Sequence, residues 1–498
     1  MTFRGGIGPA AMAVGQRERS LSPYPAADVI GLKHINSRRA AFAFGFVAVI
    51  LVFALPGSLL NAIGLYSYQS GGNPLSKFHP ATYAAVLGSL FALYGRRQGG
   101  GLAGLFRDSP ALAWSVVLIV FCMVYSAVSL GISGVAVYVD TFLAAGLAAI
   151  ALDAGTHRQR QILGYTIMTF CVINVFLSIY EEMTQTLLLP SGVLNEEIGT
   201  TARAALDEFR GQGFYEHPLS GALVTSMALF MVLGMGLRGW RVVALFGIFV
   251  VGLMSFGGRG ALATTLLILS AAALFQLTSG LATRRLNVGF LGAFIAGVFL
   301  LPALLVLLTT MTDIGLRVTT HLYLDESADV RIVQWRILSL LNVHDLLFGA
   351  SADRIGLLKN QIGLTGVGID IENPWLLTFL SLGVIGFPFL VASLFLFLWH
   401  LGRRVNTPIG WLIVIATLLI CSTNNSLGRK VPDLTFLAGM MIALSGFKSE
   451  QHESIAAPTP VISDPLDRPT AIALNPGERN RGLTDRPYVR RVPSALSG

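Results

Sequence analysis

Residues 372–399 read ENPWLLTFLSLGVIGFPFLVASLFLFLW and join a polar loop directly to an apolar helix. The apolar part, residues 376–399, is long enough to cross a bilayer, because a spanning helix needs about 20 apolar residues. The polar part closes an insert of residues 310–373 that carries arginines, acids and Trp335. Long loops that a compact domain retains are commonly functional, so this insert is the first place to look for a site.

The composition places the chain among helical membrane proteins. Hydrophobic residues make up 53% of the 498 residues and charged residues only 12%, which leaves room for roughly a dozen spans. The formal charge of +8 does not indicate a nucleic-acid partner, because the basic residues lie in short loops and in the tails. All three cysteines lie in apolar runs, so we expect neither a disulfide nor a metal site from them.

Hydropathy predicts an all-α, polytopic fold with about 12 transmembrane helices and one long outer loop between helices 9 and 10. The candidate spans are residues 41–62, 79–95, 111–131, 133–152, 161–180, 218–237, 240–256, 260–278, 287–309, 376–399, 408–424 and 432–447.

Loop charges predict the orientation of these spans. One set of short loops is rich in arginine, and the positive-inside rule assigns that set to the cytoplasm. Its members are Arg96, Arg97, Arg107, Arg158, Arg160, Arg238, Arg241, Arg284, Arg285, Arg403 and Arg404. Both termini are then cytoplasmic, and the two long loops, residues 181–217 and 310–373, face the outside.

Three regions follow from this layout. We expect residues 1–39 to form a basic cytoplasmic tail and residues 40–448 to form the transmembrane domain with its two outer loops. Residues 449–498 are rich in proline interleaved with arginine and aspartate, which predicts a disordered cytoplasmic tail.

Two outer arginines lie beside glycines. Arg210 precedes Gly211-Gln212-Gly213 and is followed by His217-Pro218 at the start of a span, where a helix N-terminus favours an anion. Arg259 lies in the tight turn SFGGRGA, residues 255–261, at the outer membrane boundary. Its glycines allow the backbone to approach an anion closely, although an isolated arginine there can simply snorkel to the headgroups.

The long insert contributes further candidates. Arg331 and Arg336 flank Trp335 and are anion-binding candidates; alternatively they form the polar face of a surface helix whose apolar residues face lipid. Those apolar residues are Val333, Trp335, Ile337 and Leu338.

Acidic residues supply the possible catalytic groups. Asp370, Glu372 and Asn373 lie at the mouth of the following helix, although exposed loop acids are the more common case. Asp140 lies within an apolar run and is a candidate because intramembrane acids are commonly functional, but it can also lie near the outer end of its helix. The acids at 325, 326 and 329 match no calcium-loop spacing, so we expect no metal.

These parts suit glycosyl transfer from a lipid diphosphate. The leaving group needs charge stabilisation rather than a strong acid, and arginine forks fit diphosphate oxygens. We therefore predict diphosphate binding by Arg210, Arg259, Arg331 and Arg336, with Glu372 or His217 as the base for the acceptor hydroxyl.

Four sequence elements together resemble the O-antigen ligase and O-antigen polymerase superfamily of bacterial envelope enzymes. The elements are Arg210-Gly211 with His217-Pro218, Ser255 to Ala261 around Arg259, Arg331 to Trp335 followed by Leu347-Phe348-Gly349, and Glu372-Asn373 followed by Gly383 and Gly386, between which we expect a helix kink. The chain departs from the family pattern at Glu372, where many members have histidine, and at Leu219, where asparagine is usual.

The resemblance implies a cofactor-free, metal-independent, inverting glycosyltransferase on the periplasmic face of the bacterial inner membrane. Its substrate would be an undecaprenyl-diphosphate-linked glycan, and its other partners would be membrane lipids and a chain-length regulator or flippase. The leading interpretation is a polymerase of exopolysaccharide or O-antigen-like repeat units. A ligase would use the same residues, whereas a transporter or flippase would show charges deep in several helices and two symmetric halves. A scaffold subunit of a secretion complex would tolerate loss of the outer arginines.

Overall fold

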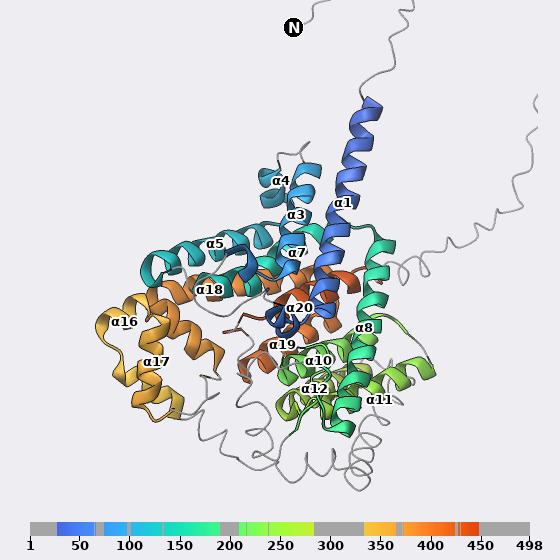
Figure 1. The fold of residues 1–498 in the computed structure, drawn as a ribbon. Coiled ribbons are helices and arrows are strands. Elements are labelled where there is room, and N and C mark those ends of the chain that lie inside the picture. Colours follow the sequence, from blue (N-terminus) through green and yellow to red (C-terminus); the bar gives the residue numbers. More distant parts are fainter. Residues whose placement is uncertain are drawn as a thin grey trace, which may run out of the picture. The chain divides into compact units, whose positions relative to one another are not determined.

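The computed structural model describes residues 27–63, 65, 74–96, 101–131, 134–189, 209–215, 217–237, 239–282, 333–364, 371, 373–423, 427–428 and 430–447. Within these ranges every regular element is a helix (Figure 1). The first half contains α1 (Ala27–Ala54), α2 (Gly57–Ala62), η1 (Pro74–Lys77), α3 (Pro80–Gly95), α4 (Leu102–Asp108), α5 (Pro110–Leu130), α6 (Val135–Val137), η4 (Tyr138–Leu143), α7 (Ala144–Leu152) and α8 (His157–Thr184). The second half contains α10 (Pro218–Gly234), α11 (Trp240–Ser255), α12 (Arg259–Ala282), η5 (Trp335–Leu340), α16 (Val343–Phe348), α17 (Ala352–Gln361), α18 (Pro374–Val405), α19 (Pro408–Thr423) and α20 (Asp433–Leu444).

The described helices are those of a membrane protein. Among them, 6 are long and apolar enough to cross a bilayer, and α10, α11, α19 and α20 are shorter apolar helices. Each predicted span except 287–309 coincides with a helix or a run of helices, and 287–309 lies outside the described residues. The all-helical class is confirmed, whereas the number of crossings stays a prediction.

Two predicted boundaries differ from the structure. α1 begins at Ala27, so residues 27–39 of the expected tail are part of the first helix. The predicted span 41–62 is broken, because α1 ends at Ala54 and α2 starts after Pro56. Proline lacks a backbone N–H and clashes with the preceding turn, so a continuous helix stops there. The predicted tail, residues 449–498, lies outside the described residues.

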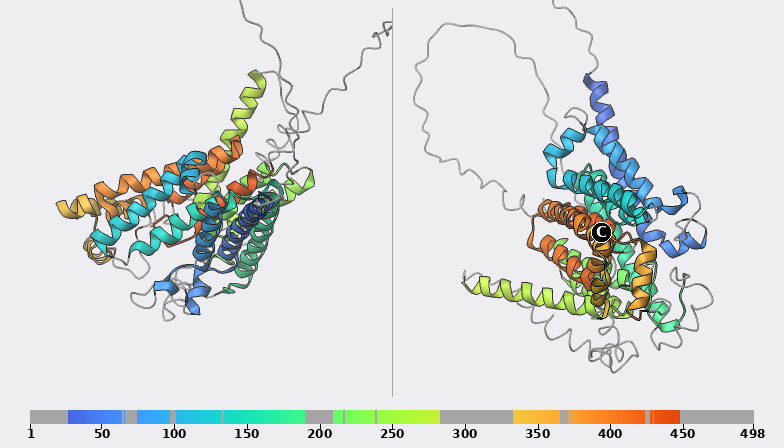
Figure 2. Two further views of the ribbon diagram at one scale, coloured as in Figure 1. Left: turned by 90° about the horizontal axis from the view of Figure 1, so that it is seen from above. Right: turned by 90° about the vertical axis from the view of Figure 1, so that its left-hand side faces the viewer.

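Long helices pack side by side without regard to their order in the chain. α5 and α18 lie against each other along their lengths (Figure 2). Their contact includes a buried hydrogen-bonded pair in which Ser393 donates to the backbone oxygen of Ser115 at 2.8 Å. Such interhelical hydroxyl bonds satisfy polar groups that have no water partner inside a membrane domain.

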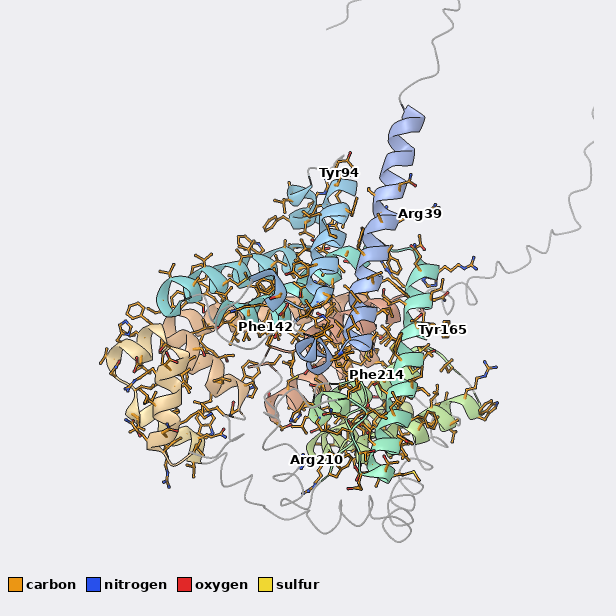
Figure 3. All side chains as sticks on the ribbon, in the orientation of Figure 1. Arg39, Tyr94, Phe142, Tyr165, Arg210 and Phe214 are labelled. Atoms are coloured by element: carbon orange, nitrogen blue, oxygen red, sulfur yellow. The ribbon has the colours of Figure 1, made fainter. Side chains whose placement is uncertain are left out.

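The two ends of the bundle carry different side chains. Arg39 and Tyr94 lie at one end, and Arg210 lies at the other, near the C-terminal end of α8 (Figure 3). The orientation of these two ends in the membrane stays a prediction.

An ion cluster around Asp153 joins four helices at the arginine-rich end. The carboxylate of Asp153 lies 2.9 Å from Nε of Arg404 and 3.4 Å from Nε2 of His400. Arg160 donates to the backbone oxygen of Asp153 at 2.8 Å and to Oγ of Ser445 at 3.2 Å. The cluster thus fastens the end of α7 to α8, α18 and α20.

The same cluster shifts the titration of its carboxylate. Burial raises the pKa of Asp153, but the hydrogen bond from His400 and the charge of Arg404 outweigh burial and hold that pKa below its usual value. Because the folded-state pKa is depressed, the carboxylate stabilises the fold above the unfolded-state pKa of about 3.9, and this contribution is lost as the pH falls through the folded-state value.

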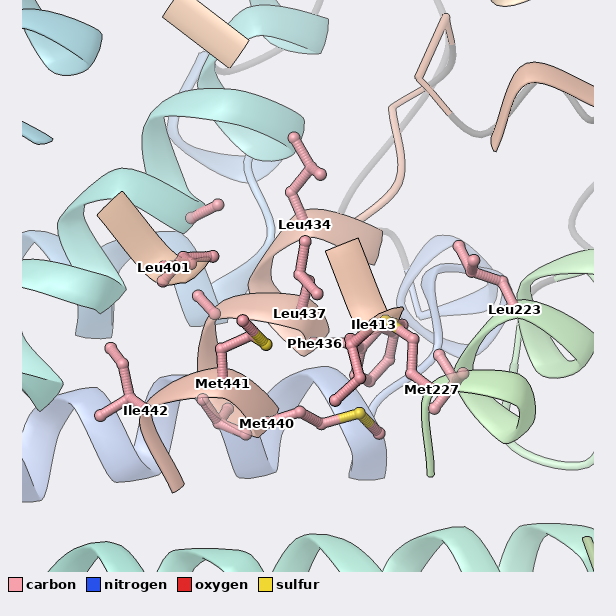
Figure 4. Packing of buried hydrophobic residues seen from close by; sticks show 14 of the residues in the cluster. Leu223, Met227, Leu401, Ile413, Leu434, Phe436, Leu437, Met440, Met441 and Ile442 are labelled. Atoms are coloured by element: carbon pink, nitrogen blue, oxygen red, sulfur yellow. The ribbon is translucent and has the colours of Figure 1, made fainter. Parts of the chain in front are cut away.

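The main core lies where α10 and α20 meet. Apolar side chains of α20 such as Phe436, Leu437 and Met440 are fully enclosed, and Leu223 and Met227 of α10 pack nearby (Figure 4). Nearly every residue of the two helices is buried, so they are surrounded by protein and not by lipid.

A second, smaller core lies at the start of α18. It joins η5, α17 and the first turns of α18 through buried apolar side chains. Its buried members are Ile337, Ala350, Ile355, Leu358, Ile371, Leu376 and Leu380. Ile337 therefore faces protein and not lipid, which corrects the surface-helix interpretation at that residue, whereas Trp335 is exposed as that interpretation requires.

The kink predicted between Gly383 and Gly386 is confirmed at Gly383, where the backbone leaves the helical region with φ 63°. The turn at Gly349 packs into the kink, because a Cβ on Gly349 would lie 2.4 Å from the backbone oxygen of Ser381. The backbone N–H of Ala350 donates to the backbone oxygen of Leu380 at 2.7 Å. This bond gives a partner to a carbonyl whose helical hydrogen bond is interrupted by the kink.

Gly349→Ala tests this junction. Gly349 has φ +92° and no room for a methyl group, so we expect the free energy of unfolding to fall by about 2 kcal/mol or more. The measurement is the thermal unfolding midpoint of the purified protein in detergent micelles. Gly356→Ala in α17 is the matched control, because a Cβ there meets nothing within 4 Å. Equal midpoints for the two variants would contradict the steric account.

Candidate functional site

The Arg210 segment is fixed to the end of α8 by a buried carboxylate. One oxygen of Glu181 accepts the backbone N–H groups of Gln212 at 2.6 Å and Gly213 at 2.7 Å. The other oxygen accepts the N–H of Leu188 at 2.9 Å. The Glu181 side chain has 0% exposure, so these bonds lie away from competing water. The carboxylate thus closes both ends of the first outer loop onto one helix.

Two neighbouring side chains extend this attachment. Glu182 accepts the N–H of Gly211 at 3.3 Å, and Oδ1 of Asn174 accepts the N–H of Phe214 at 2.7 Å. Gly213 has φ +55° and lies against Asn174, which is the reason a glycine occurs there. Sequence reasoning missed these three residues of α8. The available signal was an acid pair that ends a long apolar run.

Arg210 and the Arg259 turn come from different loops and lie in contact. A Cβ on Gly257 would lie 3.0 Å from Cδ of Arg210, and Gly257 has φ +64°. Behind them, Oγ of Ser178 and Oγ of Ser255 are 2.9 Å apart in a buried hydrogen bond. The segment that contains Arg210 and the turn that contains Arg259 therefore lie side by side.

The end of α19 connects this pair to the start of α18. A Cβ on Gly260 would lie 3.6 Å from Oγ1 of Thr423. The indole of Trp375 donates to Oγ of the adjacent Ser422 at 2.8 Å. One helix end thus touches both the residue after Arg259 and the Asn373-Pro374-Trp375 element.

Asn373 and His217 both act as helix caps. Oδ1 of Asn373 accepts the N–H groups of Trp375 at 3.0 Å and Leu376 at 3.1 Å. Nδ1 of His217 accepts the N–H of Leu219 at 3.2 Å. In a neutral imidazole that accepts through Nδ1, the proton is carried by Nε2, so this geometry suits His217 as a hydrogen-bond donor.

Asp140 lies near the start of the helical run that begins at Val135, as the alternative had it, but its side chain is buried with 2% exposure. Its carboxylate accepts the hydroxyl of Thr82 at 2.6 Å and the N–H of His79 at 3.2 Å, and it lies 3.7 Å from Nζ of Lys430. It occurs in the π-helical turn η4. Through these contacts Asp140 joins η4 to α3 and to the residues just before α20.

The remaining candidates are Arg336, Arg331, Asp370 and Glu372. Arg336 is exposed on η5 beside Trp335. Arg331, Asp370 and Glu372 lie outside the described residues, as do the acids at 325, 326 and 329.

No family model, curated protein or solved structure matches this chain. The likeness to the O-antigen enzymes accordingly rests on the four short sequence elements.

Glu181→Ala tests the attachment of the Arg210 segment. The change removes the acceptor of three backbone N–H groups, and each buried donor left without an acceptor costs about 1–3 kcal/mol. We expect the thermal unfolding midpoint in detergent to fall by several degrees. Thr184→Ala on the same helix is the control, because its exposed hydroxyl bonds only to nearby groups. A drop of similar size in both variants would show that Glu181 has no special role.

Proposed function

We propose that the protein polymerises undecaprenyl-diphosphate-linked oligosaccharide repeat units at the periplasmic face of the bacterial inner membrane. The observation that carries the proposal is the contact of Arg210 with Gly257 beside Arg259. Arg210 and the turn that carries Arg259 come from separate loops and lie together at one end of the helical bundle, which we assign to the headgroup level. Guanidinium groups keep their charge at any relevant pH and bind diphosphate oxygens through paired donors.

The chemistry needs few groups. An acceptor hydroxyl attacks the anomeric carbon of the donor glycan, the bond from that carbon to the phosphate oxygen breaks, and the configuration inverts. The hydroxyl proton passes to a base, and the diphosphate leaves on its polyprenol with added negative charge. Arg210 and Arg259 stabilise that charge as it develops, which is the main contribution a protein can make to such a step.

The capping geometry divides the remaining roles. Because Nδ1 of His217 accepts from Leu219, the imidazole suits donation to a substrate oxygen through Nε2. The base is then assigned to Glu372, which adjoins the capping residue Asn373 and takes the place of the histidine that many O-antigen enzymes have. A ligase differs from this proposal only in its acceptor, so analysis of the product separates the two.

Three variants test the arginines. In a strain that carries only the variant gene, we expect Arg210→Ala and Arg259→Ala to lower the amount of polymer by at least about 100-fold, because charge-stabilising donors contribute on this scale. Arg259→Lys keeps the charge but loses the paired donors, so we expect an intermediate loss. The measurements are polymer on gels and the amount of each variant in the membrane fraction.

Arg107→Ala is the matched control, because the Arg107 side chain is 71% exposed and pairs with its neighbour Asp108. Normal polymer from both alanine variants at the outer site would refute the enzyme proposal and favour a scaffold. Loss of polymer together with loss of lipid-linked units from the periplasmic face would favour a flippase.

A further inference from the structure

α18 is longer than a bilayer is thick. Its 32 residues would extend about 48 Å at 1.5 Å per residue, whereas the hydrocarbon core measures about 30 Å. The break at Gly383 divides the helix, and residues 384–405 alone reach about 33 Å, which is enough to cross. The length after the kink therefore allows α18 to leave the hydrocarbon at Gly383, and the first turns of α18 pack in the second core.

α16 lies at this kink. Gly349, which follows α16, packs against Gly383, and the hydroxyl of Tyr125 in α5 donates to the backbone oxygen of Phe348 at 3.0 Å. Two candidate spans, α5 and α18, thus hold the short helix at the level where one of them crosses the membrane boundary.

α16 buries its acidic side chain and exposes its apolar ones, whereas a helix in water does the opposite. Its acid, Asp345, is buried and pairs with Arg354, with Oδ2 3.1 Å from Nε. Its apolar residues point outward: Val343 is 74% exposed, and Leu346 and Leu347 are exposed as well. An outward apolar face with an inward acid is favourable where the surroundings are lipid.

The outward face continues along the two spans that hold it. Val384 and Ile385 of α18 are exposed directly after the kink, and Val128 of α5 is 82% exposed. Farther along, Phe121 of α5 and Phe389 of α18 pack with ring centroids 4.6 Å apart. Trp335, exposed in η5, is of the residue type that gathers at membrane interfaces.

We propose that α16 is an interfacial anchor whose outward face, Val343, Leu346 and Leu347, lies among the acyl chains of the leaflet next to the kink of α18. The partner is the bilayer itself, because the exposed face is continuous with the lipid-facing sides of two spans. The anchor holds the second core against the membrane surface, and it does so whether or not the protein transfers glycans.

Spin labelling tests the anchor. All three native cysteines, Cys122, Cys171 and Cys421, are buried, so a nitroxide reagent selects an introduced cysteine. Val343→Cys, Leu346→Cys and the control Asp353→Cys in α17 would each be labelled in the full-length protein. The protein would then be placed in vesicles of phosphatidylcholine and phosphatidylglycerol. The readout is the collision rate of the label with oxygen, which concentrates in lipid, against that with a water-soluble nickel chelate.

We expect labels at 343 and 346 to collide more with oxygen and the label at 353 to collide more with the chelate. The second cysteine keeps the test valid if the first variant does not fold. Labels at 343 and 346 that behave like the control would overturn the proposal. Labels screened from both reagents would overturn it too, since they would place another protein surface over α16.

Discussion

The buried carboxylate of Glu181 fixes the chain at the end of the bundle where Arg210 lies. Glu181 accepts three backbone N–H groups that lie on both sides of the first long loop, so a single residue of α8 determines where that loop starts and ends. Without it, the backbone N–H groups of Gln212, Gly213 and Leu188 would lose their acceptor. The position of Arg210 against the Arg259 turn is a consequence of this attachment, because Gly211 and Ser255 both adjoin Ser178 of the same helix.

The two ends of the bundle solve the problem of buried charge in opposite ways. At the arginine-rich end, the side chains of Arg160, Arg404 and His400 surround the carboxylate of Asp153. At the other end, the carboxylates of Glu181 and Glu182 accept backbone N–H groups of the segment that follows Arg210. These bonds fix the segment to the end of α8.

The sequence was sufficient for the class of fold and for most helices, because apolar runs of the right length have few other solutions in a bilayer. It also indicated the kink at Gly383, since two glycines interrupt an apolar run. It could not show that Ile337 is buried or that Glu181 and Glu182 hold the Arg210 segment. Those facts depend on contacts between residues far apart in the chain, and periodicity carries no information about them. The sequence showed that Asp140 lies within an apolar run, but its partner Lys430 comes from a distant part of the chain.

That distance along the chain has a consequence for biosynthesis. A ribosome completes the span containing Asp140 long before it makes Lys430, and Val431, which donates its N–H to Thr141, comes equally late. The early helices must therefore wait in the translocation machinery or the bilayer with an acid still lacking its cation. The contacts of Asp140 and Thr141 form only when the segment before α20 is made. A chain that stopped before Lys430 would therefore lack these contacts as well as α20.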